Sequence, residues 1–250
     1  MANHDLTELL AEWPHEPGRI NVREITGRDG RTKIQIRLEL GILQLESDGR
    51  PDGTRPGDME SLLQVHAARL RRHEIEHGST SGFALSSEEC AALRDEAVQY
   101  YHRYVALFAL ERFDGVVRDT SRNLEVFDLC RQHGATEQDR EVLEQFRPYV
   151  VMMRTRAQAA AFVRAGDSRS AVGSIDQGLD AIRVAFAARG KLDQFESANE
   201  TQLLRGLRDA LVPKLPSSQR MELEERLRAA IAAENYELAA ILRDELRLMD

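Results

Sequence analysis

The sequence predicts a mainly α-helical protein: a bundle of helical hairpins with a small β-hairpin near the N-terminus and an antiparallel helical hairpin at the C-terminus. Apolar residues recur at helical spacing through nearly all of the chain after Asp58, whereas period-two alternation is confined to the stretch between Val22 and Leu45. The composition, with 42% hydrophobic, 30% charged and only 6% aromatic residues, is typical of a soluble helical protein. We therefore divide the chain into an N-terminal arm (1–19), a β-hairpin with a Gly/Pro loop (20–58), a helical body (59–212) and a C-terminal helical hairpin (217–250).

Helix-breaking prolines and the periodicity of apolar residues predict the structure of the N-terminal segments. Apolar residues at helical spacing in the arm are cut off by Pro14 and Pro17, which predicts a short helix or a loose arm. Alternation on both sides of Asp29-Gly30 predicts a β-hairpin over 20–45, whose second strand continues through a bulge at Gly41. The following loop, 47–57, lacks the GxxxxGK[ST] pattern, so we favour an ordered connection over a phosphate-binding loop.

The helical body is bounded by capping and stop residues. Asp58 is expected to cap a first helix, in which His66 packs against the core and which ends near Gly78. Ser86 and Glu89 form a predicted capping box for a long helix that reaches Phe108. Further helices are expected from Val116 to a stop at Gly134, over 137–146, from Pro148 to Phe162, after the turn 165–167 as far as Gly190, and from a Ser197–Glu200 cap to Leu211.

The body also contains a sequence that matches the zinc-protease pattern HExxH. Histidines at positions i and i+4 of a helix reach one metal ion, and the glutamate between them serves as the base; here these residues are His73, Glu74 and His77. The flanking residues are charged and a Gly/Ser-rich stretch follows at once, whereas the ligands of such proteases lie on a buried helix. We therefore expect a solvated helix end without zinc, and treat a metal-dependent hydrolase as a remote alternative.

Charge and cysteine content narrow the functional classes further. A formal net charge of −8 opposes direct binding of nucleic acid, which requires a clustered basic surface. Cys90 and Cys130 lie far apart without CxxC spacing, so we expect buried free thiols rather than a zinc site or a disulfide. There is no basic start with a long apolar run and no apolar stretch long enough for a bilayer, so we expect a cytoplasmic protein with no membrane contact and no cofactor.

The C-terminal stretch 217–250 predicts two antiparallel helices that reverse at Asn235. The first carries an apolar row, Leu223, Leu227, Ala230 and Ile231, and the second carries two rows. One row of the second helix (Ala239, Leu242, Leu246) faces the first helix, so the other remains for a docking partner or for the body of the same chain. The predicted protein-binding residues are Tyr236, Leu238, Ile241, Arg243 and Leu248.

The residues of this hairpin resemble the UVR motif, which UvrB and UvrC repair proteins share with the McsA adaptor and ClpC-type unfoldases. The resemblance rests on the pattern Glu-Asn-Tyr-Glu-x-Ala-Ala-x-Leu-Arg-Asp over 234–244, with Asn235 where the family usually has Asp. It implies a protein-interaction module that often pairs with a second copy as a four-helix arrangement. It covers little more than a tenth of the chain.

A second, weaker resemblance lies in the middle of the chain. The run 161–172, Ala-Phe-Val-Arg-Ala-Gly-Asp-Ser-Arg-Ser-Ala-Val, is similar to the helix-turn-helix unit of tetratricopeptide repeats (TPRs). Apolar helix positions in this region recur when the chain is shifted by 55 residues. Tetratricopeptide repeats recur every 34 residues, so this spacing weakens the case for a repeat array.

These observations favour a non-catalytic adaptor or scaffold that docks or dimerises through its C-terminal hairpin. Its partner would be a protein, either another UVR-motif protein or a second copy of this chain in a homodimer. The alternative is an accessory factor in nucleotide-excision DNA repair that contacts UvrB- or UvrC-like proteins, although the chain has no P-loop. A kinase-activating role like that of McsA is disfavoured, because the paired CxxC zinc sites of that family have no counterpart here.

Overall fold

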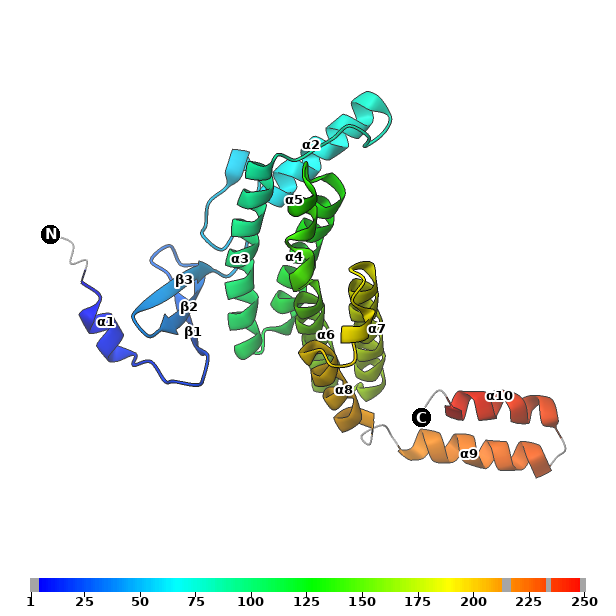
Figure 1. Cartoon of the computed structure of the whole chain (residues 1–250). Coiled ribbons are helices and arrows are strands. Elements are labelled where there is room, and N and C mark those ends of the chain that lie inside the picture. Colours follow the sequence, from blue (N-terminus) through cyan, green and yellow to red (C-terminus); the bar gives the residue numbers. More distant parts are fainter. Residues whose placement is uncertain (1–4, 213–216, 233–234, 248–250) are drawn as a thin grey trace.

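The computed structural model describes residues 5–212, 217–232 and 235–247 of the chain. It contains a three-stranded antiparallel sheet near the N-terminus, a body of helices and a C-terminal pair of helices. Figure 1 shows the sheet beside the long helix α3 and the C-terminal pair beyond α8, the last helix of the body. The predicted fold class, mainly α with a small N-terminal β element and a C-terminal helical hairpin, is confirmed.

The N-terminal part comprises the short helix α1 (Thr7–Glu12) and the strands β1 (Asn21–Thr26), β2 (Thr32–Leu38) and β3 (Gly41–Glu46). The predicted hairpin corresponds to β1 and β2. The predicted continuation of the second strand through Gly41 is wrong, because the chain reverses after Leu38, and Leu38 pairs with Gly41 across a tight connection. A third strand thereby occupies the free edge of β2, and since two-stranded hairpins are marginal in water, this stabilises the sheet.

The connection from the sheet to the helices includes a 3-10 turn (Pro56–Asp58) and leads to α2 (Leu62–His77). The N-cap of α2 is Ser61, whose hydroxyl accepts a hydrogen bond from the Gln64 amide at 3.3 Å, and not Asp58 as predicted. Asp58 lies in the preceding turn with a φ of 62°. The predicted end is confirmed, because Gly78 closes α2 in the left-handed conformation that favours glycine.

The body continues through six helices and two 3-10 turns. The capping box of Ser86 and Glu89 at the start of α3 is confirmed. The helix expected over 137–146 is instead a short helix and a 3-10 turn, and the last body helix has Ala198 at its N-cap without the predicted side-chain cap from Ser197. The bounds are α3 (Ser87–Ala109), α4 (Phe113–His133), α5 (Glu137–Glu141), η2 (Glu144–Phe146), α6 (Arg147–Arg164), α7 (Ser168–Ala188), η3 (Leu192–Gln194) and α8 (Asn199–Leu211).

Successive long helices of the body pack antiparallel around a single hydrophobic core. The core extends from Ile34 on the sheet through α3, α4, α6 and α7 to Leu204 and Leu211 on α8. The contact between α6 and α7 is close: a Cβ atom on Gly178 would lie 2.2 Å from the Thr155 hydroxyl oxygen. Glycine at this position therefore lets the two helix backbones approach each other.

The C-terminal pair consists of α9 (Ser217–Ala232) and α10 (Tyr236–Arg247). Three of its residues, Ala230, Ala239 and Leu242, form a second hydrophobic cluster, and among the residues that the structure describes this cluster shares none with the core of the body. Within the described ranges, no helix combines the length and the apolar character needed to cross a bilayer.

Candidate functional site

The contact between α9 and α10 is made by small and aliphatic side chains. Ala230 on α9 and Ala239 on α10 are both buried, and Leu242 is buried beside them with Leu223 and Leu227 packed around. Alanine at facing positions allows two helices to approach closely. The predicted assignment of Ala239 and Leu242 to the inner row of α10 is confirmed.

Asn235 fixes the reversal between the two helices. Its backbone amide donates to the Ala230 carbonyl at 2.9 Å, which closes the end of α9. Its side-chain oxygen accepts a hydrogen bond from the Leu238 amide at 3.1 Å, the position that an N-cap residue satisfies. Aspartate caps in the same way, so the difference from the usual Asp of the motif leaves the capping bond intact.

The outer face of α10 carries exposed aliphatic side chains. Leu238 is 37% exposed and Ile241 is 54% exposed, one turn apart on the same face. Among the other predicted contact residues, Arg243 is exposed and lies 3.8 Å from the Asp244 carboxylate. Tyr236 begins α10, but its side chain lies outside the described part of the structure, as does Leu248.

One residue of the hairpin departs from its predicted position. Ile231 was expected in the inner row of α9 but is 53% exposed, because Ala230 takes the place against α10. Ile231 follows Ala230 by one residue, whereas Leu238 precedes Ala239 by one residue. In an antiparallel pair, these two displacements point to opposite faces of the hairpin, so Ile231 and Leu238 lie on different surfaces.

The HExxH residues lie in the last turns of α2, which extends away from the rest of the body in Figure 1. The rings of His73 and His77 are stacked with centroids 4.2 Å apart. A ring nitrogen of each histidine lies within hydrogen-bonding distance of a backbone oxygen, Ser81 O for His73 and His73 O for His77. Both Glu74 and His77 are exposed, and in the described ranges no third His, Cys, Asp or Glu joins them in a metal-binding group. That zinc does not bind here stays a prediction.

A buried group of charged residues, which the helical periodicity of the sequence does not predict, joins the sheet to the helices. Arg103 on α3 donates to both carboxylate oxygens of Asp119 on α4, at 2.7 and 2.8 Å. It also donates to the carbonyls of Glu46, the last residue of β3, and of Gly49, in the loop that follows. Arg103 and Asp119 are at most 1% exposed. The signal in the sequence is an arginine and an aspartate at core-facing positions of two amphipathic helices.

Glu96 on α3 forms the second part of this group. Its carboxylate accepts hydrogen bonds from the backbone amides of Leu62 and Leu63, at the N-terminus of α2, and forms ion pairs with Arg50 and Arg122. A carboxylate at a helix N-terminus is favoured by the helix dipole. The 47–58 loop is therefore an ordered connection held by buried charges, as predicted.

The histidine and cysteine side chains of the body are also packed. His66 is buried as predicted, and burial lowers its pKa. Cys90 and Cys130 are buried free thiols, as predicted, and burial raises the pKa of Cys130 to about 12. A thiol with so high a pKa is almost entirely protonated at neutral pH and is a poor nucleophile.

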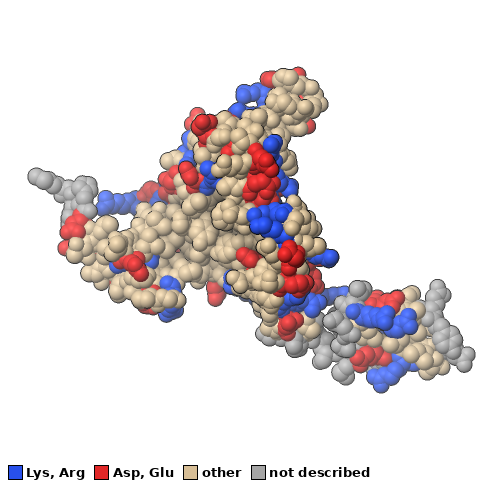
Figure 2. Space-filling model, in the orientation of Figure 1, with Lys and Arg blue, Asp and Glu red and all other residues tan. Residues whose placement is uncertain are grey.

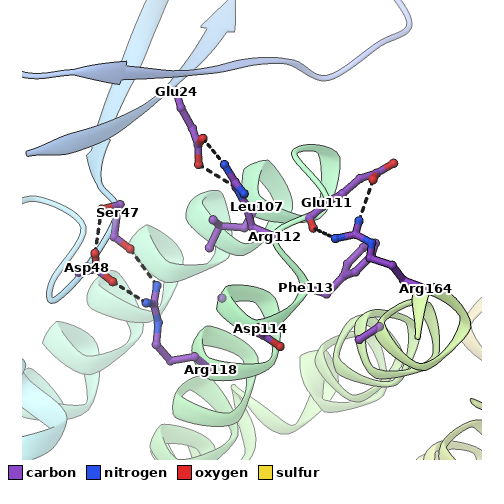
Figure 3. A pocket seen from close by; sticks show the side chains of 12 residues that line it. Glu24, Ser47, Asp48, Leu107, Glu111, Arg112, Phe113, Asp114, Arg118 and Arg164 are labelled. Carbon is purple, nitrogen blue, oxygen red and sulfur yellow. Dashed lines mark hydrogen bonds and ion pairs between the residues drawn. The ribbon is translucent and has the colours of Figure 1, made fainter. Parts of the chain in front are cut away.

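Figure 3 shows a pocket of about 500 Å³ between the sheet and the connection from α3 to α4. Three arginines line it, and each is paired with a carboxylate: Arg112 with Glu24, Arg118 with Asp48, and Arg164 with Glu111. Each of these three arginines is already neutralised by a carboxylate. Their ion pairs connect β1, the 47–58 loop and α6 to the neighbouring helices, so these three side chains do not provide an unpaired cation for a ligand. On the face shown in Figure 2, acidic and basic side chains also lie interspersed, without a continuous basic surface.

The structure thus brings together a helical hairpin with an aliphatic core, an asparagine-capped reversal and an exposed aliphatic face. Residues 220–249 match the family model described as the UvrB/uvrC motif, so the C-terminal hairpin carries a UVR motif. The motif indicates a role in protein interaction, as in UvrB and UvrC. No curated protein and no solved structure matched the chain.

Proposed function

We propose that this protein is a non-catalytic adaptor or scaffold whose C-terminal UVR hairpin docks on another protein chain. The observation that supports this is the exposure of Leu238 and Ile241 on a hairpin that already has its own core. Folding of the hairpin therefore does not require these side chains, and an aliphatic face without a folding role is typical of a binding surface. The proposal needs no catalytic residue.

The energetics support a modest, specific interface. Burial of one Leu or Ile side chain contributes roughly 1.5–3 kcal/mol. Two or three such side chains, from the contact residues Leu238, Ile241 and Leu248 with Tyr236 and Arg243 flanking, give enough for an interface of moderate affinity once entropic costs are subtracted. A carboxylate placed in the same contact would be desolvated without a partner, which costs more than the lost apolar area.

The test compares two substitutions of the same residue type on the full-length protein. Ile241→Asp should abolish the self-association measured by analytical ultracentrifugation, or the retention of a partner in a pull-down from the source lysate, with helicity nearly unchanged. Ile231→Asp is the matched control, because Ile231 is as exposed as Ile241 but lies on the opposite face. Equal binding by wild type and Ile241→Asp would refute the proposal. Loss of the folded state in Ile241→Asp would show that the face packs on its own chain.

A second candidate is an accessory role in DNA repair, in contact with a UvrB- or UvrC-like protein. It is favoured by the motif match alone. Binding of the purified protein to a UvrB-type protein, lost with Ile241→Asp and kept with Ile231→Asp, would favour it over an adaptor of another pathway.

A further inference from the structure

A groove on the body lies between α4, α6 and α7. Its floor and one wall are apolar: Val151 from α6 is buried, and Ala181, Ala185 and Ala188 follow one another along α7 at helical spacing. Val184, on the same part of α7, is 67% exposed. A row of alanines on one wall leaves room for another helix to approach closely.

The rim of this groove carries an excess of positive charge. Arg131, Arg147 and Arg154 line it with the carboxylates of Asp128 and Glu144. Arg147 holds both carboxylates, at 2.8 and 2.7 Å, and Arg131 lies 3.5 and 3.9 Å from the same two groups. The two carboxylates of Asp128 and Glu144 thus neutralise Arg131 and Arg147. The third arginine of the rim has no carboxylate among these residues to neutralise it.

Arg154 is that third arginine. It is half-buried on α6, and among the residues that the structure describes it has no ion-pair partner. Burial, together with the neighbouring Arg147, lowers the pKa of its guanidinium. A half-buried cation at the edge of an apolar groove, in a chain whose formal net charge is −8, favours an occupant with carboxylates beside aliphatic side chains.

The outer face of α10 has this combination of side chains. Glu245 follows Ile241 by four residues and Leu238 by seven, so it lies on the same face as both, and Asp244 lies one turn from Ile241. Both carboxylate residues are exposed. The face of α10 is therefore aliphatic and acidic, whereas the groove is aliphatic and basic.

The connectivity favours the α10 of another molecule over that of the same chain. Arg208 of α8 pairs with Asp176 of α7 at 2.7 Å, which places α8 on that side of α7. Asp176 and Ala185 are nine residues apart, about two and a half helical turns, so they point to opposite sides of α7. The chain leaves α8 on the side away from the groove, and the four residues 213–216 span at most about 14 Å.

We propose that the groove between α4, α6 and α7 receives the face of α10 that carries Leu238, Ile241 and Glu245 from a second copy of this chain. Two such contacts, exchanged reciprocally, form a closed two-fold dimer. The inference rests on the proposed docking role of the hairpin and names the surface on which it docks.

Charge reversal on the full-length protein tests this pairing. Arg154→Glu and Glu245→Arg should each weaken the dimer at least tenfold in analytical ultracentrifugation. A mixture of the two variants should recover the dimer, because a heterodimer contains one native contact and one contact with both charges exchanged. Val184→Asp should also weaken the dimer, without a folding defect, since its side chain is largely exposed. Arg183→Glu, at an exposed arginine of α7 outside the groove lining, is the matched control and should leave the dimer unchanged.

The outcomes separate this inference from the proposed function. If Ile241→Asp and Glu245→Arg break the dimer while Arg154→Glu and Val184→Asp do not, the hairpins pair with each other and the groove is not their receptor. A wild-type protein that stays monomeric across the micromolar range overturns the second-copy proposal. An assembly unchanged by Ile241→Asp overturns both the groove proposal and the docking role of this face.

Discussion

At the scale of single residues, the most consequential side chains are charges in places where apolar residues are expected. Arg103, Asp119 and Glu96 are almost completely buried on α3 and α4. A helical pattern in the sequence identifies which positions face a core, but it does not identify which polar residue pairs with which across two helices. The pairing depends on the distance between helices, and this is why the sequence predicted the helices and missed the ion pairs.

Removing one partner of the buried pair should destabilise the body. Asp119→Ala leaves the Arg103 guanidinium without its carboxylate, and such a loss costs about 3–5 kcal/mol. Urea unfolding followed by circular dichroism would measure it. Arg112→Ala is the matched control: its ion pair with Glu24 is largely exposed, so the loss should be at most about 1 kcal/mol. Equal losses in the two variants would contradict the importance of burial.

His66 should make stability depend on pH between about 6.5 and the mildly acidic range. Burial lowers the pKa of His66 in the folded protein, outweighing the opposite effect of Glu89, and its Nδ1 lies 2.9 Å from the Arg69 guanidinium. The unfolded chain then binds a proton more readily than the folded chain. The stabilising effect is complete above the unfolded pKa and is lost as the pH falls from there toward the folded pKa. Chemical unfolding at a series of pH values should show a smaller loss in His66→Gln, and an identical loss would exclude His66 as the cause.

At the scale of elements, the hairpin was the best predicted part of the chain, since its fold follows from spacing alone. Ala239 and Leu242 were correctly placed inside, and Leu238 and Ile241 outside. The error at Ile231 arose because two consecutive residues, Ala230 and Ile231, both fit a helical row. The structure selects Ala230, whose small side chain lets α9 and α10 approach.

The reversal of the hairpin offers a test by capping. Asn235→Ala removes the side-chain acceptor of the Leu238 amide and should cost about 1 kcal/mol of hairpin stability. Asn235→Asp keeps the acceptor and adds a negative charge at a helix N-terminus, so it should be neutral or stabilising. Hydrogen exchange of the α9 and α10 amides would measure both. Equal destabilisation by alanine and aspartate would contradict the capping role.

A substitution in the core of the hairpin should unfold the hairpin, whereas a substitution on its outer face should not. Leu242 is 2% exposed, and its replacement by alanine costs about 2–5 kcal/mol, more than a two-helix unit of this size is expected to tolerate. Leu242→Ala should therefore unprotect the amides of α9 and α10 in hydrogen exchange while those of α6 and α7 stay protected. Ile241→Ala, at a largely exposed position, should change neither set in dilute samples, in which the chain is monomeric. Loss of protection in α6 as well would show that the two cores are coupled.

At the scale of the whole molecule, periodicity was sufficient for the fold class but not for the arrangement. The third strand was missed because Gly41 fits a bulge and a tight reversal equally well in the sequence. The N-cap Ser61 was missed because Asp58 is an equally good cap former by type, and the N-cap Ala198 was missed because Ser197 beside it is the better cap former by type. The groove at Ala181 and Ala185 could not be foreseen, since it depends on which side of α7 receives α8.

The two cores predict how a truncated chain behaves. Deletion of 217–250 should leave the thermal unfolding midpoint of the monomeric body unchanged, because the two hydrophobic clusters have no described residue in common. Differential scanning calorimetry on dilute samples would measure this. A lower midpoint in the truncated protein would instead favour the alternative that the hairpin closes the core of its own chain.

The bond between Arg103 and the loop after β3 has a consequence for the order of events during synthesis. The strands leave the ribosome first, but Asp119, which orients Arg103, is made 73 residues after Glu46. At about 5–20 residues per second, the finished sheet waits roughly 4–15 s for the helices that cover it. During this interval Ile34 and Ile36, on the face that the helices later bury, have no helix over them, whereas the Lys33 ammonium on the opposite face already has its local partners Asp29 and Glu46. The apolar face of the nascent sheet is therefore open to wrong contacts until the helices that cover it have been made.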